Sequence, residues 1–141
     1  AWVERGGGLL MVGGYFSFQG IDGKARWRKT PVEDVLPVTC HPWDDRVEMP
    51  EGAVPEVLQP DHPVMSGLDG AWPFVLGVNE VEVRADAQVL ARIPEEGDIR
   101  IFFRCPCRVI IVFCTDGDQR VFSRCCENFT STKCRVPVVK A

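Results

Sequence analysis

A short apolar run between two glycine clusters is the feature that most restricts how this chain can fold. Leu9-Leu10-Met11-Val12 follows Gly6-Gly7-Gly8 and precedes Gly13-Gly14. Four consecutive apolar residues bounded by glycines are typical of a strand buried on both faces of a parallel sheet. Residues 1–5 resemble the end of a helix that glycine terminates. Helix, glycine turn and buried strand together predict an α/β unit that begins before residue 1.

The segment after this strand is the predicted ligand site. In open α/β sheets, ligands bind beyond the carboxyl ends of the strands. We therefore expect a small-molecule ligand to contact the following residues: Gly13, Gly14, Tyr15, Ser17, Gln19 and Asp22. Ser17 is the strongest nucleophile candidate in this segment. The alternative, which we favour, is a serine that bonds to nearby backbone in a glycine-rich turn.

The rest of the chain predicts short elements. Thr30 as N-cap, Pro31 and Glu33 favour a short helix up to Leu36. The proline-rich stretch that follows favours extended chain and loops. Further elements are expected as an edge strand around 45–49, a helical turn at 66–68, strands at 75–83 and 88–93, and a hairpin of 99–103 with 109–113.

Composition bounds the class of protein. A chain of 141 residues with 45% apolar and 26% charged residues forms one globular domain. No window provides the roughly 18 apolar residues that span a bilayer, and no secretory signal is recognisable. The net charge of -4 disfavours nucleic-acid binding. We expect a cytoplasmic protein that binds neither membrane nor nucleic acid.

The charge and the cysteine content of the chain change near Asp98. Residues 1–98 are acidic and contain one cysteine, Cys40, whereas residues 99–141 are rich in arginine and cysteine. The paired spacings Cys105-Pro-Cys107 and Cys125-Cys126 are too short for usual zinc knuckles. An odd cysteine count without an export signal favours reduced thiols. We expect no metal and no cofactor, and an altered terminus remains an alternative explanation of this tail.

Residues 2–92 resemble a known family, the glutamine amidotransferase-like proteins of the class I amidotransferase superfamily. The resemblance rests on these segments: Trp2-Val3-Glu4-Arg5-Gly6-Gly7-Gly8-Leu9-Leu10-Met11-Val12-Gly13-Gly14-Tyr15, Phe16-Ser17-Phe18-Gln19-Gly20-Ile21-Asp22-Gly23, Thr30-Pro31-Val32-Glu33-Asp34-Val35-Leu36-Pro37-Val38, Asp44-Asp45-Arg46-Val47-Glu48, Asp61-His62-Pro63-Val64 and Gly77-Val78-Asn79. It implies a flavodoxin-like α/β sandwich whose N-terminal half is absent here. Residues 1–98 would be a partial amidotransferase-like domain, and residues 99–141 a divergent β-rich hairpin and tail of the same domain.

The fold of a family does not by itself determine which reaction a member catalyses. A class I glutaminase needs a cysteine on a glycine-flanked elbow, a histidine base and oxyanion donors. Neither Cys40 nor Cys114 has that setting. We therefore predict a ligand-binding or assembly domain that forms homo-oligomers and has no glutaminase activity. The alternative is a hydrolase or amidotransferase that uses Ser17, or a nucleophile outside this chain, with His41 or His62 as base.

A second interpretation concerns His41 and the two aspartates that follow it. His41 with Asp44 and Asp45 could bind a metal. The interpretation we favour is a solvated loop in which Asp45 bonds to backbone groups. Cys40 and His41 are adjacent, and on an extended chain they point to opposite faces.

Overall fold

The computed structural model describes residues 2–3, 5, 7–68 and 70–93 in full, and the backbone of strands 100–104 and 109–112. Within these residues the chain forms short strands and three single-turn 3-10 helices, and no α-helix. The cysteines beyond Cys40 and the predicted tail lie outside this part. The described architecture is thus β-rich, with mostly antiparallel pairing.

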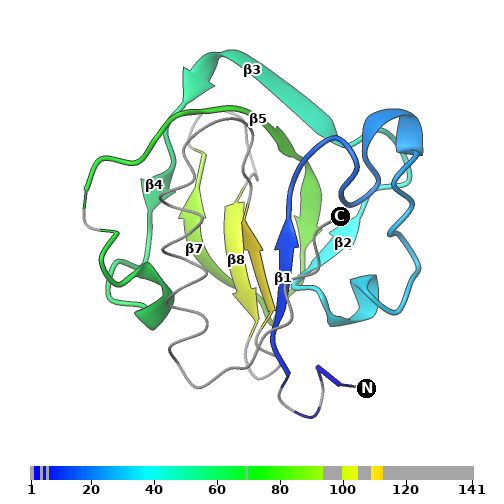
Figure 1. Cartoon of the computed structure of the whole chain (residues 1–141), viewed down its shortest axis with the longest axis horizontal. Coiled ribbons are helices and arrows are strands. Elements are labelled where there is room, and N and C mark those ends of the chain that lie inside the picture. The colour runs from blue at the N-terminus through cyan, green and yellow to red at the C-terminus, as the bar shows by residue number, and fades with distance from the viewer. Residues whose placement is uncertain are drawn as a thin grey trace.

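A five-stranded mixed sheet forms the main layer, in the order β1-β9-β8-β7-β4. Its strands are β1 (Leu9–Val12), β4 (Glu56–Val57), β7 (Gln88–Arg92), β8 (Arg100–Arg104) and β9 (Val109–Val112). Among the described strands, β1 and β9 are the parallel pair, with Leu9 opposite Val109. The other pairs are antiparallel, and Figure 1 shows the strands running side by side. The predicted first strand and C-terminal hairpin are confirmed.

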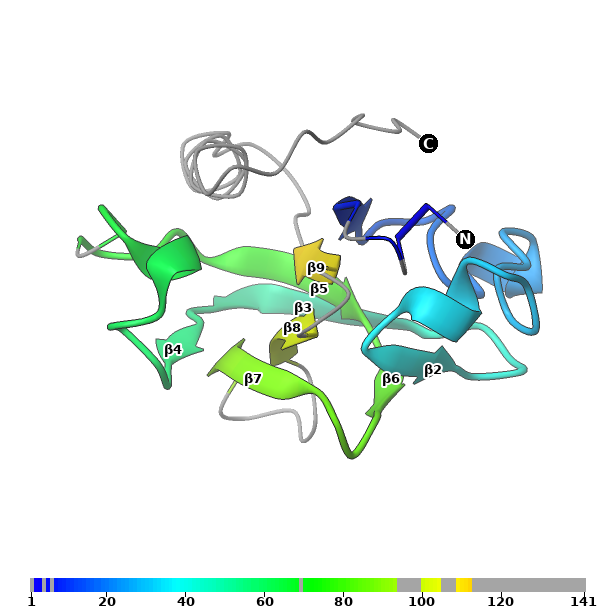
Figure 2. The same cartoon turned by 90° about the horizontal axis from the view of Figure 1, so that it is seen from below.

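Two antiparallel ribbons complete the fold. One pairs β2 (Val38–Cys40) with β6 (Val81–Val83), and the other pairs β3 (Arg46–Ala53) with β5 (Val75–Asn79). In Figures 1 and 2 the β3–β5 ribbon crosses one end of the main sheet, and β2 lies beyond β1. The single strand expected at 75–83 is therefore wrong, because Glu80 separates two strands that join different ribbons.

The helices are shorter than the sequence predicts. They are η1 (Ile21–Gly23), η2 (Glu33–Val35) and η3 (Pro63–Met65). The N-cap of η2 is Val32 and not the predicted Thr30, although Thr30 Oγ1 accepts a 3.5 Å hydrogen bond from the Glu33 backbone N–H. The helix cannot continue because Leu36 precedes Pro37 and is extended, with ψ of 153°. The expected turn at 66–68 begins earlier, at Pro63.

The expected helix end at residues 1–5 is a turn in the described residues. The Gly7 backbone N–H donates to the Trp2 carbonyl at 3.1 Å. This bond spans five residues and is of the kind that closes helix C-termini. Among the described residues, no helix is long and apolar enough to cross a membrane.

The core lies between the main sheet and the two ribbons. Phe18, Leu36 and Val38 are completely buried there. Burial of each large apolar side chain contributes about 1.5–3 kcal/mol. Phe18 belongs to the segment after β1, so its burial attaches that segment to the core. It does so in a left-handed conformation, with φ of 54°.

Candidate functional site

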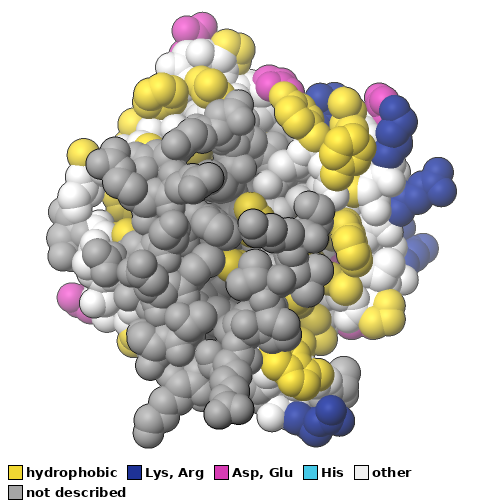
Figure 3. Space-filling model, viewed as in Figure 1, with side chains coloured by type: hydrophobic (Ala, Val, Ile, Leu, Met, Phe, Trp, Pro, Cys, Tyr) yellow, Lys and Arg dark blue, Asp and Glu magenta, His cyan; other side chains and the backbone are white. Residues whose placement is uncertain are grey.

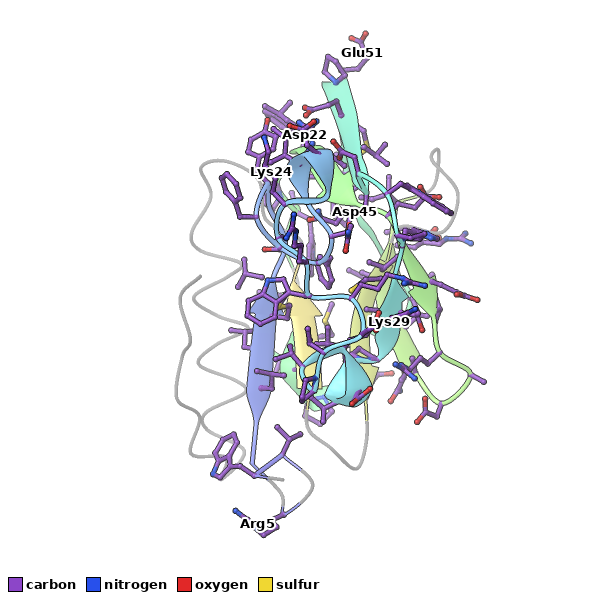
Figure 4. The ribbon with its side chains drawn as sticks, turned by 90° about the vertical axis from the view of Figure 1, so that its right-hand side faces the viewer. Arg5, Asp22, Lys24, Lys29, Asp45 and Glu51 are labelled. Carbon is purple, nitrogen blue, oxygen red and sulfur yellow. The ribbon has the colours of Figure 1, made fainter. Side chains whose placement is uncertain are left out.

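The segment between β1 and β2 is anchored by one buried carboxylate, that of Asp45. Asp45 is 1% exposed and accepts hydrogen bonds from the backbone N–H of Gln19 at 2.7 Å and of Gly20 at 3.0 Å. A buried charge is tolerated when hydrogen bonds replace its hydration. In Figure 4 Asp45 lies directly below the loop that carries Asp22 and Lys24.

Asn79 holds the other end of the same loop. Its Oδ1 accepts from the Gly14 backbone N–H at 2.8 Å, and its Nδ2 donates to the Gly14 carbonyl at 3.2 Å. The same Nδ2 donates to Asp45 Oδ1 at 2.8 Å. Asn79 and Asp45 therefore form one buried polar network that fixes residues 13–20 against β3 and β5.

A groove of about 420 Å³ opens beside this network. Its lining comes from the loop and from the β3–β5 ribbon: Gly14, Tyr15, Arg46, Val47, Glu48, Pro50, Leu76, Gly77, Val78 and Asn79. Gly14 and Tyr15 are the predicted ligand residues that line it. Tyr15 is 53% exposed, and the Arg46 guanidinium lies 5.3 Å from the centre of its ring.

Arg46 is the charged centre of the groove. It donates to Asp44 from Nε at 3.0 Å and from Nη2 at 2.9 Å, and it lies 3.5 Å from Glu48. The hydrogen bonds from Arg46 hold the pKa of Asp44 far below its usual range. The same pairing raises the pKa of Arg46, so both groups stay charged at any physiological pH.

Ser17 is buried and is not among the residues that line the groove. It is 5% exposed, and its hydroxyl donates to the Val12 carbonyl at 2.5 Å. The structure records no hydrogen bond between Ser17 and either His41 or His62 within the described residues. A serine nucleophile needs such a base to accept its proton. The geometry resembles a serine that closes a local turn.

Cys40 is equally enclosed. It is 2% exposed in β2, and burial, together with the neighbouring Glu33 carboxylate, raises the pKa of its thiol to about 12. Its backbone N–H donates to Glu33 Oε1 at 2.6 Å. Burial alone would raise the pKa of Glu33, but hydrogen bonds from the backbones of Cys40 and Lys29 outweigh it and lower the pKa. A thiolate at Cys40 would lie beside this carboxylate in a buried environment.

The two histidines lie in separate settings. The His41 ring stacks on Trp43, with centroids 4.7 Å apart and an interplanar angle of 12°. His62 Nδ1 accepts from the Val64 backbone at 3.3 Å, and burial lowers the pKa of His62. Among the described residues, no group of three His, Cys, Asp or Glu side chains is arranged to hold a metal ion.

The other predicted ligand residues, Gly13, Ser17, Gln19 and Asp22, lie outside the groove lining. The Gln19 backbone binds Asp45, and the Asp22 carboxylate pairs with Lys24 at 2.8 Å. The groove residues that sequence reasoning missed are Arg46, Glu48 and Asn79. The pattern Asp44-Asp45-Arg46-Val47-Glu48 contained a signal, because charges at alternate strand positions face the same side.

Comparison with known proteins now identifies the family. The family model described as "Putative glutamine amidotransferase" matches residues 1–121. The chain belongs to this family. The predicted resemblance is therefore confirmed. No match was found among curated proteins.

Two solved structures from the bacterium Salmonella typhimurium are similar to this member of the family. Cytoplasmic protein STM3548 is 34% identical with a TM-score of 0.79, and the match covers 93% of this chain and 56% of that chain. Cytoplasmic protein STM1381 of strain LT2 is 33% identical with a TM-score of 0.72, and the match covers 94% and 55%. The chain thus spans little more than half the length of either protein.

Proposed function

We propose that this chain is a non-catalytic, ligand-binding part of a glutamine amidotransferase-like protein. The observation that carries the proposal is the enclosure of Cys40, whose thiol has a pKa raised to about 12. A glutaminase nucleophile must be a thiolate near neutral pH. The occupied hydroxyl of Ser17 supports the same conclusion for the other candidate.

The groove supports the ligand-binding part of the proposal. Arg46 and Glu48 place a cation and a carboxylate 3.5 Å apart at one wall, beside the exposed Tyr15 ring. Such a pair suits a small zwitterion whose carboxylate and amine engage opposite charges. Free glutamine has this chemistry and matches the family's description, so it is the first ligand to test.

The context of this domain is also part of the proposal. The family supports a class I amidotransferase-like, flavodoxin-like sandwich for the complete domain, in which residues 1–98 and 99–141 belong together. The exposed aromatic residues Tyr15, Phe16 and Trp43 support assembly into a homo-oligomer. The similar Salmonella proteins are named as cytoplasmic, which supports the same location here.

The test measures glutamine binding and ammonia release separately in the full-length protein. Calorimetry with glutamine compares the wild type with Arg46→Met and with Arg92→Met. Arg92 is a matched control because it pairs with Glu56 at 2.7 Å on strands that do not line the groove. We expect binding that Arg46→Met weakens about tenfold, a loss typical of one charged contact, while Arg92→Met leaves it unchanged.

Ammonia release decides the catalytic question. We expect none above background from the wild type, Ser17→Ala or Cys40→Ala. Turnover that Ser17→Ala or Cys40→Ala abolishes would overturn the non-catalytic assignment and identify the nucleophile. Turnover that survives both variants would mean that another residue of the full-length protein is the nucleophile. Equal effects of Arg46→Met and Arg92→Met on binding would contradict the assignment of the groove.

A further inference from the structure

The loop between β1 and β2 carries a concentrated positive charge on an otherwise acidic chain. Residues 24–29, here called the basic loop, read Lys-Ala-Arg-Trp-Arg-Lys, while the whole chain has a net charge of -4. Figure 3 shows Lys and Arg side chains gathered along the right-hand edge, over this connection. The basic loop does not line the groove described above.

Within the part of the chain that the structure describes, three of the four basic-loop cations have no carboxylate partner. Lys24 pairs with Asp22 at 2.8 Å. Arg26, Arg28 and Lys29 form no ion pair with any carboxylate of the described residues. The Arg28 Nε is buried without a hydrogen-bond partner. A buried arginine Nε without a partner leaves hydrogen-bond capacity that an oxyanion would satisfy.

Two residues of the basic loop have strained backbone, and hydrogen bonds hold the loop backbone to the rest of the protein. Arg26 and Lys29 are left-handed, with φ of 61° and 58°. The Lys29 backbone N–H donates to Glu33 Oε2 at 2.6 Å, and the Trp27 N–H donates to the Phe18 carbonyl at 2.9 Å. Left-handed non-glycine residues cost of order 1 kcal/mol or more each and cluster at ligand clamps. Here that cost falls within a segment that carries four cations.

We propose that the basic loop binds a small multivalent oxyanion of the phosphate class, through Arg26, Arg28 and Lys29. Neutralising three adjacent cations favours a ligand with several negative charges over a single carboxylate. The acidic remainder of the chain disfavours a nucleic-acid duplex, which requires a wider basic surface. Trp27 is half-buried and stands between Arg26 and Arg28 in the sequence. A phosphate ligand with an attached planar group is therefore compatible with the same site. The proposal is independent of the groove and of its ligand.

Calorimetry with inorganic pyrophosphate tests the proposal on the full-length protein at about 0.15 M salt, where weak surface attraction is screened. The variants are Arg26→Asn and Lys29→Asn, because asparagine tolerates left-handed backbone better than alanine. Arg5→Asn is the matched control, since Arg5 is exposed and lies outside the basic loop. Each basic-loop variant is expected to weaken binding about tenfold, and the control less than twofold.

Comparing ADP, pyrophosphate and adenosine as ligands distinguishes a nucleotide-like ligand from a free oxyanion. Tighter binding of ADP than of pyrophosphate, with no binding of adenosine, would support the proposal with a nucleotide-like ligand. Equal binding of ADP and pyrophosphate would support it with a free oxyanion. The proposal is overturned if pyrophosphate gives no binding heat, or if Arg5→Asn weakens binding as much as Arg26→Asn does. Thermal unfolding of each variant checks that the fold is intact.

Discussion

Removing the Asp45 carboxylate should detach the loop after β1 from the rest of the protein. Three donors converge on this side chain: the backbone N–H groups of Gln19 and Gly20 and the Asn79 amide. Asp45→Ala leaves the two backbone N–H groups without an acceptor and removes one of the two hydrogen bonds that the Asn79 amide donates. A buried donor that loses its partner costs about 1–3 kcal/mol, and water entering the vacated space recovers part of this. We expect the free energy of unfolding to fall by about 3–5 kcal/mol.

A conservative variant sharpens the prediction. In Asp45→Asn, the remaining carbonyl can occupy the Oδ1 position and keep the bonds from Gly20 and Asn79, which are 3.0 and 2.8 Å long. Only the bond from Gln19 is lost, together with the charge. The expected loss is about 1.5–3 kcal/mol, the contribution of one hydrogen bond to a charged group.

Urea unfolding monitored by circular dichroism measures both variants beside Asp61→Ala. Asp61 is exposed, so its removal should change the unfolding free energy by no more than about 0.5 kcal/mol. If Asp45→Ala costs no more than Asp61→Ala, the carboxylate does not anchor the loop. If Asp45→Asn costs as much as Asp45→Ala, the carbonyl does not replace Oδ1 in the way described.

Two further predictions concern the same half of the molecule. The lowered pKa of Glu33 means that its carboxylate stabilises the fold above its ordinary value of 4.5 and loses this contribution as pH falls through the lower folded value. The advantage of wild type over Glu33→Gln in unfolding free energy should therefore shrink from about pH 6 to about pH 3, and a constant difference would contradict it. Gly20 has φ of 71°, and a Cβ there would lie 2.6 Å from the Tyr15 carbonyl oxygen. Gly20→Ala should lower the free energy of unfolding by about 2–4 kcal/mol relative to Gly70→Ala, whose Cβ meets no atom, and equal free energies of unfolding would refute the close approach.

Local patterns account for the part of the fold that sequence reasoning predicted. The strand at Leu9–Val12 and the hairpin of β8 and β9 are encoded by neighbouring residues, namely an apolar run between glycines and two β-rich runs. The break at Glu80 is not encoded in this way. Its backbone N–H donates to the Asp45 carbonyl at 2.6 Å, and that partner lies far away in the sequence.

Sequence reasoning predicted where the candidate site lies, but it predicted only some of the residues that form it. Glycines after a strand marked the loop, and Gly14 and Tyr15 do line the groove. Asp45 was expected to bond to backbone groups in a solvated loop; it does bond to backbone, but it is buried. Burial depends on Asn79, a partner 34 residues away that a single sequence does not reveal.

The parallel pairing of β1 with β9 has a consequence for how the protein is made. Leu9 pairs with Val109, so β1 leaves the ribosome long before its partner strand is synthesised. Contacts between residues so distant in the chain form slowly, because loop closure must precede any gain from pairing. During that interval the edge of Leu9–Val12 that later pairs with β9 has no partner, and an uncovered strand edge favours association with other nascent chains. Productive synthesis of this protein should therefore depend on chaperones that cover the first strand until residue 112 has emerged.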